Sequence, residues 1–129
     1  MARRPPRPAR GAAVVDFVLV LTILVPLFLG VLQVGLVLMV RNTLASAAAE
    51  GARYAAALDR DLADGEARTR AQIDGALSGR YADDIDVTTV AIDGQPTVRV
   101  TVRATVPALG LGGPGVEISV QGHAVEEAP

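Results

Sequence analysis

The feature that most constrains this chain is an uncharged run of 24 residues near its N-terminus, from Phe17 to Val40. The hydrocarbon core of a bilayer is about 30 Å thick, and an α-helix needs about 20 apolar residues to cross it. A helix that is apolar on all sides must be buried in a large core or in lipid. A chain of 129 residues has too little other sequence to enclose this run. It therefore predicts one transmembrane helix over residues 17–40.

Arginine placement predicts the orientation of that helix. Four arginines lie in the first ten residues (Arg3, Arg4, Arg7 and Arg10), whereas Arg41 alone follows the run at once. Basic residues favour the cytoplasmic side of a membrane, so we expect the N-terminus inside and the C-terminal part outside. From Asn42 onward the chain has 7 arginines against 13 acidic residues, a net charge of −6. That balance disfavours a nucleic-acid partner.

A cleaved secretory signal peptide is the main alternative for the N-terminal segment. It would account for the basic start, and Ala45-Ser46-Ala47 resembles an A-x-A cleavage site. However, the apolar region of a signal peptide is usually about 7–15 residues long, and this run is much longer. We therefore favour a retained membrane anchor.

The membrane helix is expected to continue beyond the lipid. Residues Asn42 to Leu58 are rich in alanine, the strongest helix former, and contain no proline. We predict one helix over residues 12–58. Small side chains along its second part would let another helix approach closely. Within the membrane run, Pro26 is expected to free the Thr22 carbonyl, and Gln33 is expected to bond to a neighbouring helix.

Residues 59–129 predict a small extracytoplasmic domain. A helix is expected over Gly65–Leu77, because Ile73 and Leu77 lie on one face and Gly79 can end it. Thr97–Val106 alternates valine with polar residues, which is typical of a half-buried strand. Ile85–Ile92 is the expected partner through a turn at residues 93–96, and a third strand begins at Val116 after a glycine-rich loop at residues 110–115.

These elements predict an α+β fold, in which a long N-terminal transmembrane helix precedes one helix and a three-stranded antiparallel sheet. The sequence offers no catalytic constellation. There is no cysteine, and the single histidine, His123, is expected at the surface. Asp83, Asp84 and Asp86 lack the ligand pattern of a calcium loop and indicate a solvated turn. We therefore expect no enzyme activity, no cofactor and no metal site.

The junction before the membrane run is the most informative place. In Gly11-Ala12-Ala13-Val14-Val15-Asp16-Phe17 one carboxylate stands at the mouth of an otherwise apolar helix. Ionisable residues in membrane segments are costly and are candidates for a function. The other interpretation is that Asp16 lies among the lipid headgroups, where a negative charge suits a helix N-terminus.

At these residues the chain resembles the TadE-like pseudopilins of Flp (tight-adherence) pilus systems, and more broadly the type IV prepilins. Their hallmark is a short basic leader that ends in glycine and is cleaved by a prepilin peptidase. An apolar helix follows, with a glutamate at its fifth position. Here the leader would be residues 1–11, with cleavage between Gly11 and Ala12, and Asp16 would take the fifth position in place of glutamate. Pro26 and the motif Gly51-Ala52-Arg53 also resemble the family.

The resemblance implies a minor pilin or pseudopilin that supports biogenesis of a Flp/Tad-type pilus for adhesion or secretion. It implies a cytoplasmic (inner) membrane location. The implied partners are the membrane, a prepilin peptidase, other pilins or pseudopilins and the Tad secretion machinery. Asp16 would pair with the Ala12 amine of another subunit. The alternative is an uncleaved, single-pass membrane anchor for an extracytoplasmic binding module.

Overall fold

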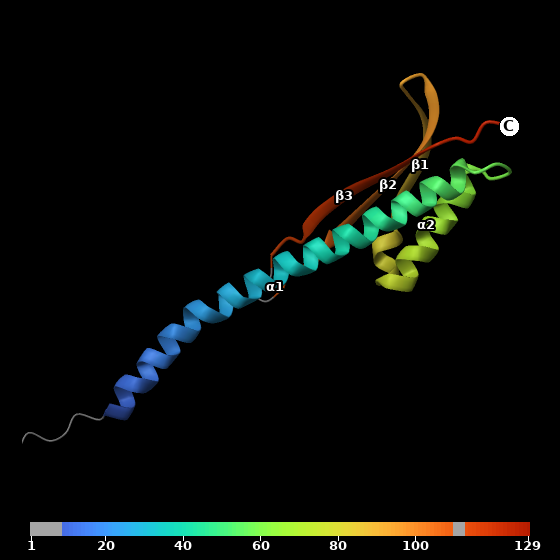
Figure 1. Ribbon diagram of the computed structural model, residues 1–129. Coiled ribbons are helices and arrows are strands. Elements are labelled where there is room, and N and C mark those ends of the chain that lie inside the picture. The colour runs from blue at the N-terminus through green and yellow to red at the C-terminus, as the bar shows by residue number, and fades with distance from the viewer. Residues whose placement is uncertain (1–8, 110–112) are drawn as a thin grey trace, which may run out of the picture.

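The computed structural model describes residues 9–109 and 113–129 and shows the predicted α+β fold. The elements in chain order are α1 (Ala9–Ala56), α2 (Leu62–Ala76), the short 3-10 helix η1 (Gly79–Ala82), β1 (Asp84–Ile92), β2 (Gln95–Val106) and β3 (Val116–Val125). The first half of α1 extends alone, whereas its second half packs against the sheet and against α2, which also contacts the sheet (Figure 1).

Helix α1 contains 48 residues, which corresponds to a length of about 72 Å. It includes the expected start at Ala12 and ends two residues before Leu58. Tertiary hydrogen bonds lie at this helix end. The Glu127 amide donates to the Ala56 carbonyl at 2.9 Å, and the Leu58 amide donates to Glu127 Oε2 at 3.2 Å. The C-terminal tail thus supplies partners for backbone groups that a helix end leaves unpaired.

Strand β2 is the centre of the sheet, and both of its neighbours are antiparallel to it. Val100 pairs with Val87 on one side and with Gly122 on the other. As the alternation predicts, Val98, Val100 and Val102 are buried. The opposite face of β2 departs from the expectation, because Thr97 and Thr101 are buried there as well.

Two local boundaries differ from the sequence prediction. The β1–β2 turn consists of Asp93 and Gly94 alone, and both have positive φ angles (51° and 79°), as a two-residue type I′ hairpin requires. Helix α2 begins at Leu62, three residues before the expected Gly65, because Asp61 and Asp64 form a reciprocal capping box.

The core joins the sheet to the second half of α1. Val40, Leu44, Ala48 and Ala52 are at most 1% exposed and belong to the same cluster as the inward valines of β2. Ile73 of α2 completes it. Residue 58 therefore lies close to the end of the helix, but it does not separate the helix from the packed core. The core begins within α1, near Val40.

Candidate functional site along the N-terminal helix

The first half of α1 exposes apolar side chains in every direction. Phe17, Ile23 and Val31 are each more than 60% exposed, and the most apolar 18-residue window of the helix has a mean hydropathy of 2.7 with none of its residues buried. Among the described residues α1 is the one helix long and apolar enough to cross a membrane. Exposure of this apolar surface to water is unfavourable in free energy. The helix therefore suggests single-pass membrane anchoring.

Helix α1 continues through Pro26 without interruption. Proline removes one backbone donor inside a helix, so the expected unpaired acceptor is the Thr22 carbonyl. The Thr22 hydroxyl itself donates to the Val18 carbonyl at 2.7 Å. The Thr22 hydroxyl is therefore hydrogen-bonded within the helix, as polar groups in an apolar environment must be.

Gly11, Ala12 and Asp16 lie in the first two turns of α1 and are exposed. Ala12 and Asp16 are four residues apart, so they share one face of the helix. The described residues form three salt bridges, Arg68–Glu50, Arg70–Glu66 and Arg103–Asp84, and none of them includes Asp16. Most of the expected leader, residues 1–8, lies outside the described residues.

The three residues of the Gly51-Ala52-Arg53 motif have different environments. Gly51 faces α2, where an added Cβ would overlap Thr69 Oγ1 and lie 2.9 Å from the Gly65 carbonyl oxygen. Ala52 is fully buried, whereas Arg53 is exposed. Gly51 and Ala52 therefore serve the packing of α1 against the domain, and Arg53 lies on the accessible side.

The family described as TadE-like protein matches residues 11–53. This segment is TadE-like. No curated protein and no solved structure matches the chain. The match begins at the glycine of the expected cleavage site and ends at the arginine of the Gly51-Ala52-Arg53 motif. The TadE-like family is a structural, pilus-associated family, and the match suggests a Tad pilus-associated protein.

The TadE-like segment contains one polar contact that sequence reasoning assigned to the wrong partner. Gln33 was expected to bond to a neighbouring helix. Instead, its Nε2 donates to the Pro107 carbonyl at 3.2 Å, and its Oε1 accepts from the Leu109 amide at 2.8 Å. Both ends of the side-chain amide are bound by the segment that follows β2. The partners lie 74 and 76 positions away along the chain, which explains why no local pattern signalled this contact.

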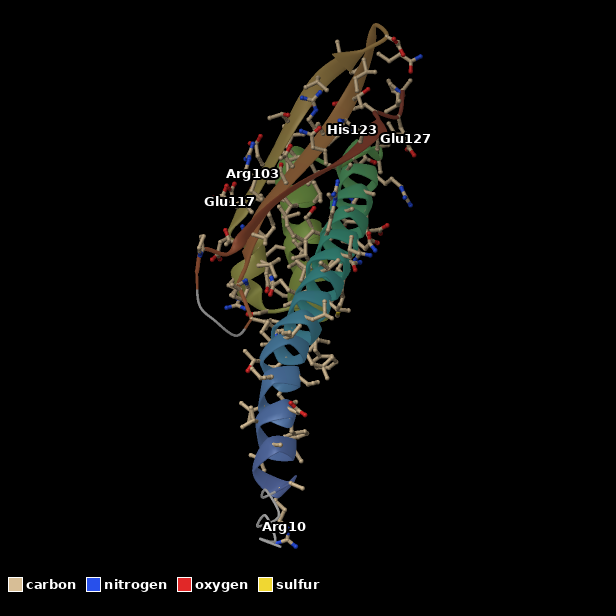
Figure 2. All side chains as sticks on the ribbon, turned by 90° about the vertical axis from the view of Figure 1, so that its left-hand side faces the viewer. Arg10, Arg103, Glu117, His123 and Glu127 are labelled. Atoms are coloured by element: carbon tan, nitrogen blue, oxygen red, sulfur yellow. The ribbon has the colours of Figure 1, made fainter. Side chains whose placement is uncertain are left out.

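Outside the TadE-like segment, the outer face of the sheet is polar. Arg103, Glu117, His123 and Glu127 are spread along the sheet and the tail that follows it (Figure 2). His123 is exposed, as expected from the sequence, and its Nε2 accepts a hydrogen bond from Arg99 Nε at 3.1 Å. His123 Nε2 is thus occupied by a surface hydrogen bond to the Arg99 guanidinium.

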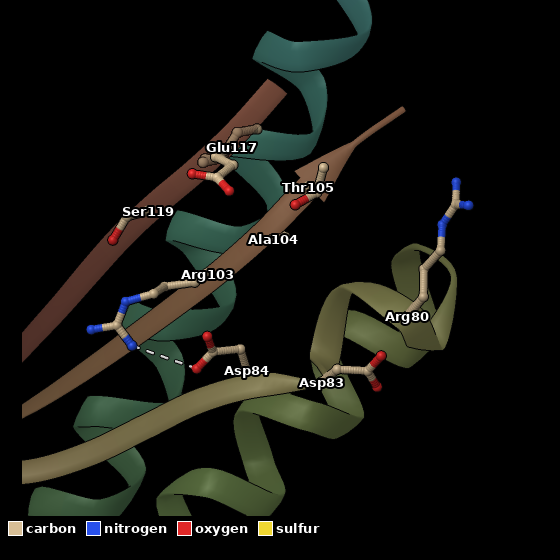
Figure 3. Close-up of a pocket in the computed structure, with 9 residues that line it drawn as sticks. Arg80, Asp83, Asp84, Arg103, Ala104, Thr105, Glu117 and Ser119 are labelled. Atoms are coloured by element: carbon tan, nitrogen blue, oxygen red, sulfur yellow. Dashed lines mark hydrogen bonds and ion pairs between the residues drawn. The ribbon is translucent and has the colours of Figure 1, made fainter. Parts of the chain in front are cut away.

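A shallow cavity of about 680 Å³ lies at the end of the sheet nearer η1. Asp84 and Arg103, which are paired on β1 and β2, form an ion pair in its lining at 3.5 Å, and both side chains are more than half exposed. Figure 3 shows Arg80 directed away from this pair and Asp83 on the far side of Asp84. An ion pair this exposed contributes little to stability, because water screens it. Within residues 9–109 and 113–129 no cluster of metal-ligating side chains is present.

Proposed function

We propose that this chain is a minor pilin or pseudopilin that supports biogenesis of a Flp/Tad-type pilus for adhesion or secretion. The observation that carries the proposal is the TadE-like match, which starts at Gly11, directly before the apolar helix. The proposed protein is anchored by α1 in the cytoplasmic membrane, with its N-terminus inside and the domain formed by residues 59–129 outside. Its proposed organisation is a leader (1–11), an N-terminal helix (12–58) and that domain.

The proposed processing step is hydrolysis of the Gly11–Ala12 peptide bond by a prepilin peptidase. The bond lies in the first turn of α1, and helix ends fray easily, so little structure must open to expose it. Glycine has no side chain to obstruct close approach of the backbone to the peptidase. The basic residues of the leader, including Arg10, hold this bond at the membrane surface.

The proposed role of Asp16 is to pair with a second subunit. Hydrolysis creates an ammonium group on Ala12, and a carboxylate in an apolar environment is costly without a partner. The Ala12 amine of a neighbouring chain would compensate that charge and set the register between two packed helices. Asp16 is exposed and has no salt-bridge partner among the described residues, which leaves it available for this pairing.

Intact-mass measurement of membrane-extracted protein, co-expressed with its prepilin peptidase, tests the processing. We expect a mature chain that begins at Ala12, and Gly11→Leu should abolish cleavage. Gly30→Leu is the matched control, because Gly30 also lies in α1 with nothing within 4 Å of an added Cβ. A chain that begins near Ala48 would indicate an ordinary signal peptide. An unprocessed chain beside an active peptidase would favour the anchored binding module.

Co-isolation of two differently tagged copies tests the pairing. Asp16→Ala should reduce recovery of the second copy while cleavage continues. Asp16→Glu, which keeps the charge, should preserve both. Equal recovery for Asp16→Ala and the unchanged chain would refute the pairing role.

An enzyme reporter that is active only outside the cytoplasm, fused after Pro129, should be active if the proposed orientation holds.

A further inference from the structure

The Gln33 contact bears on how the domain sits relative to the lipid. Gln33 lies inside the uncharged run from which the membrane span was predicted, yet both ends of its amide bind the backbone of Pro107 and Leu109. On the domain side of Gln33, Leu36 and Val37 pack against the core and Val40 is buried. The folded domain therefore reaches down α1 as far as Gln33.

Two placements of the bilayer have different consequences for the backbone. If the hydrocarbon extended to Val40, the segment Pro107–Leu109 would lie about 10 Å inside it, since Val40 is seven positions after Gln33 along the helix. Irregular backbone exposed to lipid at that depth leaves polar groups unsatisfied and does not occur. If the hydrocarbon ends at Gln33, the same segment lies at the boundary with the headgroups, where water is available.

The other end of the helix supports the second placement. Counting back about 20 residues from Gln33, the length of a membrane span, reaches Ala13. Arg10 then lies just outside the hydrocarbon, and Asp16 lies within reach of the headgroups. Counting from Val40 in the same way reaches Val20, which would leave the exposed, apolar Phe17 outside the hydrocarbon. On the outer side, Val34 and Leu38 fall in the headgroup layer, about 5–7 Å thick.

The composition of the connection after β2 agrees with contact to lipid. Residues 107–115, which join β2 to β3, contain no charged side chain, although 20% of the whole chain is charged. Pro107 and Leu109 are exposed, Leu109 to 40%. An uncharged segment that is fixed to the membrane helix at the edge of the hydrocarbon is suited to the interfacial layer of a phospholipid bilayer.

We propose that Gln33 marks the outer limit of the hydrocarbon and holds Pro107–Leu109 against the lipid surface, so that the domain rests directly on the membrane. The segment with its Gln33 contact is called the seating contact below. This inference rests on membrane anchoring by α1, one part of the proposed function. The seating contact would fix the height and tilt of the domain above the lipid.

Tryptophan fluorescence of the full-length chain tests the seating contact, because the sequence contains no tryptophan. Three single variants, Phe28→Trp, Leu109→Trp and Val125→Trp, are placed in phosphatidylcholine vesicles brominated at shallow or deep acyl positions. Phe28 and Val125 are exposed sites in the span and at the distal end of β3. We expect deep bromines to quench Phe28→Trp, shallow bromines to quench and blue-shift Leu109→Trp, and neither to quench Val125→Trp.

The outcomes separate the seating contact from the anchoring on which it rests. Quenching of Phe28→Trp with Leu109→Trp as unquenched as Val125→Trp would overturn the seating contact and leave the anchor intact. An unquenched Phe28→Trp would overturn the anchoring itself. A double variant combines the reporter Leu109→Trp with Gln33→Leu. The leucine is similar in size to glutamine but makes neither of the two hydrogen bonds. We expect it to lose the shallow quenching, with circular dichroism showing an intact fold; unchanged quenching would refute the role of Gln33.

Discussion

Replacing Gly51 with alanine is the sharpest test of how α1 and α2 pack. The added methyl group would overlap Thr69 Oγ1 and lie 2.9 Å from the Gly65 carbonyl oxygen. Thr69 is fully buried and its hydroxyl donates to the Gly65 carbonyl at 2.8 Å, so it has no free space to move into. The two helices would have to separate, or this hydrogen bond would have to break.

The magnitude follows from two opposing effects. Alanine is a better helix residue than glycine by about 0.5–1 kcal/mol. Overpacking a buried contact costs about 1–3 kcal/mol or more, and the loss of one hydrogen bond costs about another 1 kcal/mol. A buried, β-branched side chain and a backbone atom are the obstacles here, so we expect the upper end of that range. The net loss in free energy of unfolding should be about 2–3 kcal/mol.

Gly75 provides a matched control in α2. An added Cβ there has nothing within 4 Å, so Gly75→Ala keeps the gain in helix propensity without the overlap. The two variants should differ by about 3 kcal/mol, and in a domain of this size each kcal/mol corresponds to about 4–8 °C in Tm. Thermal unfolding of the full chain in detergent, followed by circular dichroism, measures this difference. The double variant Gly51→Ala/Thr69→Ala should recover part of the loss, because the overlap with Oγ1 is gone.

Equal or increased stability of Gly51→Ala relative to Gly75→Ala would refute the close-contact explanation. A loss that is strictly additive with Thr69→Ala would show that Thr69 is not the obstacle. Either result would mean that the Gly51-Ala52-Arg53 motif acts through something other than the packing of α1 against α2.

Three further predictions concern the sheet and the surface charges. Gly122→Ala should destabilise the fold by about 1–3 kcal/mol, because its Cβ would overlap the backbone of Ala48 where β3 crosses α1. Chemical denaturation measures this loss, and an unchanged free energy of unfolding would show that the contact is loose. Val100→Asp places an unpaired charge at a fully buried site and should abolish cooperative unfolding, whereas a native-like transition would contradict the burial. Arg103→Ala breaks a half-exposed ion pair and should change stability by less than about 1 kcal/mol, with a larger loss refuting its surface character.

A truncation tests where the packed core begins. A chain that starts at Asp59 lacks Leu44, Ala48 and Ala52, which cover the inner face of the sheet. We expect this fragment to aggregate or to show no cooperative unfolding, whereas a fragment that starts at Val37 should fold. Analytical size exclusion and thermal unfolding distinguish the two, and a stable, monomeric fragment from Asp59 would contradict the shared core.

Much of the architecture was predictable, because it depends on patterns that are local in the chain. The uncharged run predicted a long apolar helix from the thickness of a bilayer, and the period-two alternation of Val98, Val100 and Val102 predicted a half-buried strand. The glycine-ended leader before that helix pointed to the TadE-like family. Even the early start of α2 had a local signal, the Asp61–Asp64 capping box, which went unused.

The partners of these elements became visible only in the folded structure. The small side chains of α1 predicted a close neighbour, but only the fold shows that the neighbours are α2 at Gly51 and β3 near Ala48, both within the same chain. The bond from the Glu127 amide to the Ala56 carbonyl and the two bonds of Gln33 join residues more than 70 positions apart. Hydropathy and propensity describe a residue and its near neighbours, whereas such contacts exist only after the sheet has packed on α1. For that reason local patterns were enough to predict the apolar helix, the strands and the TadE-like resemblance. Where the core begins, and which residues hold the domain to the helix, depends on the folded structure.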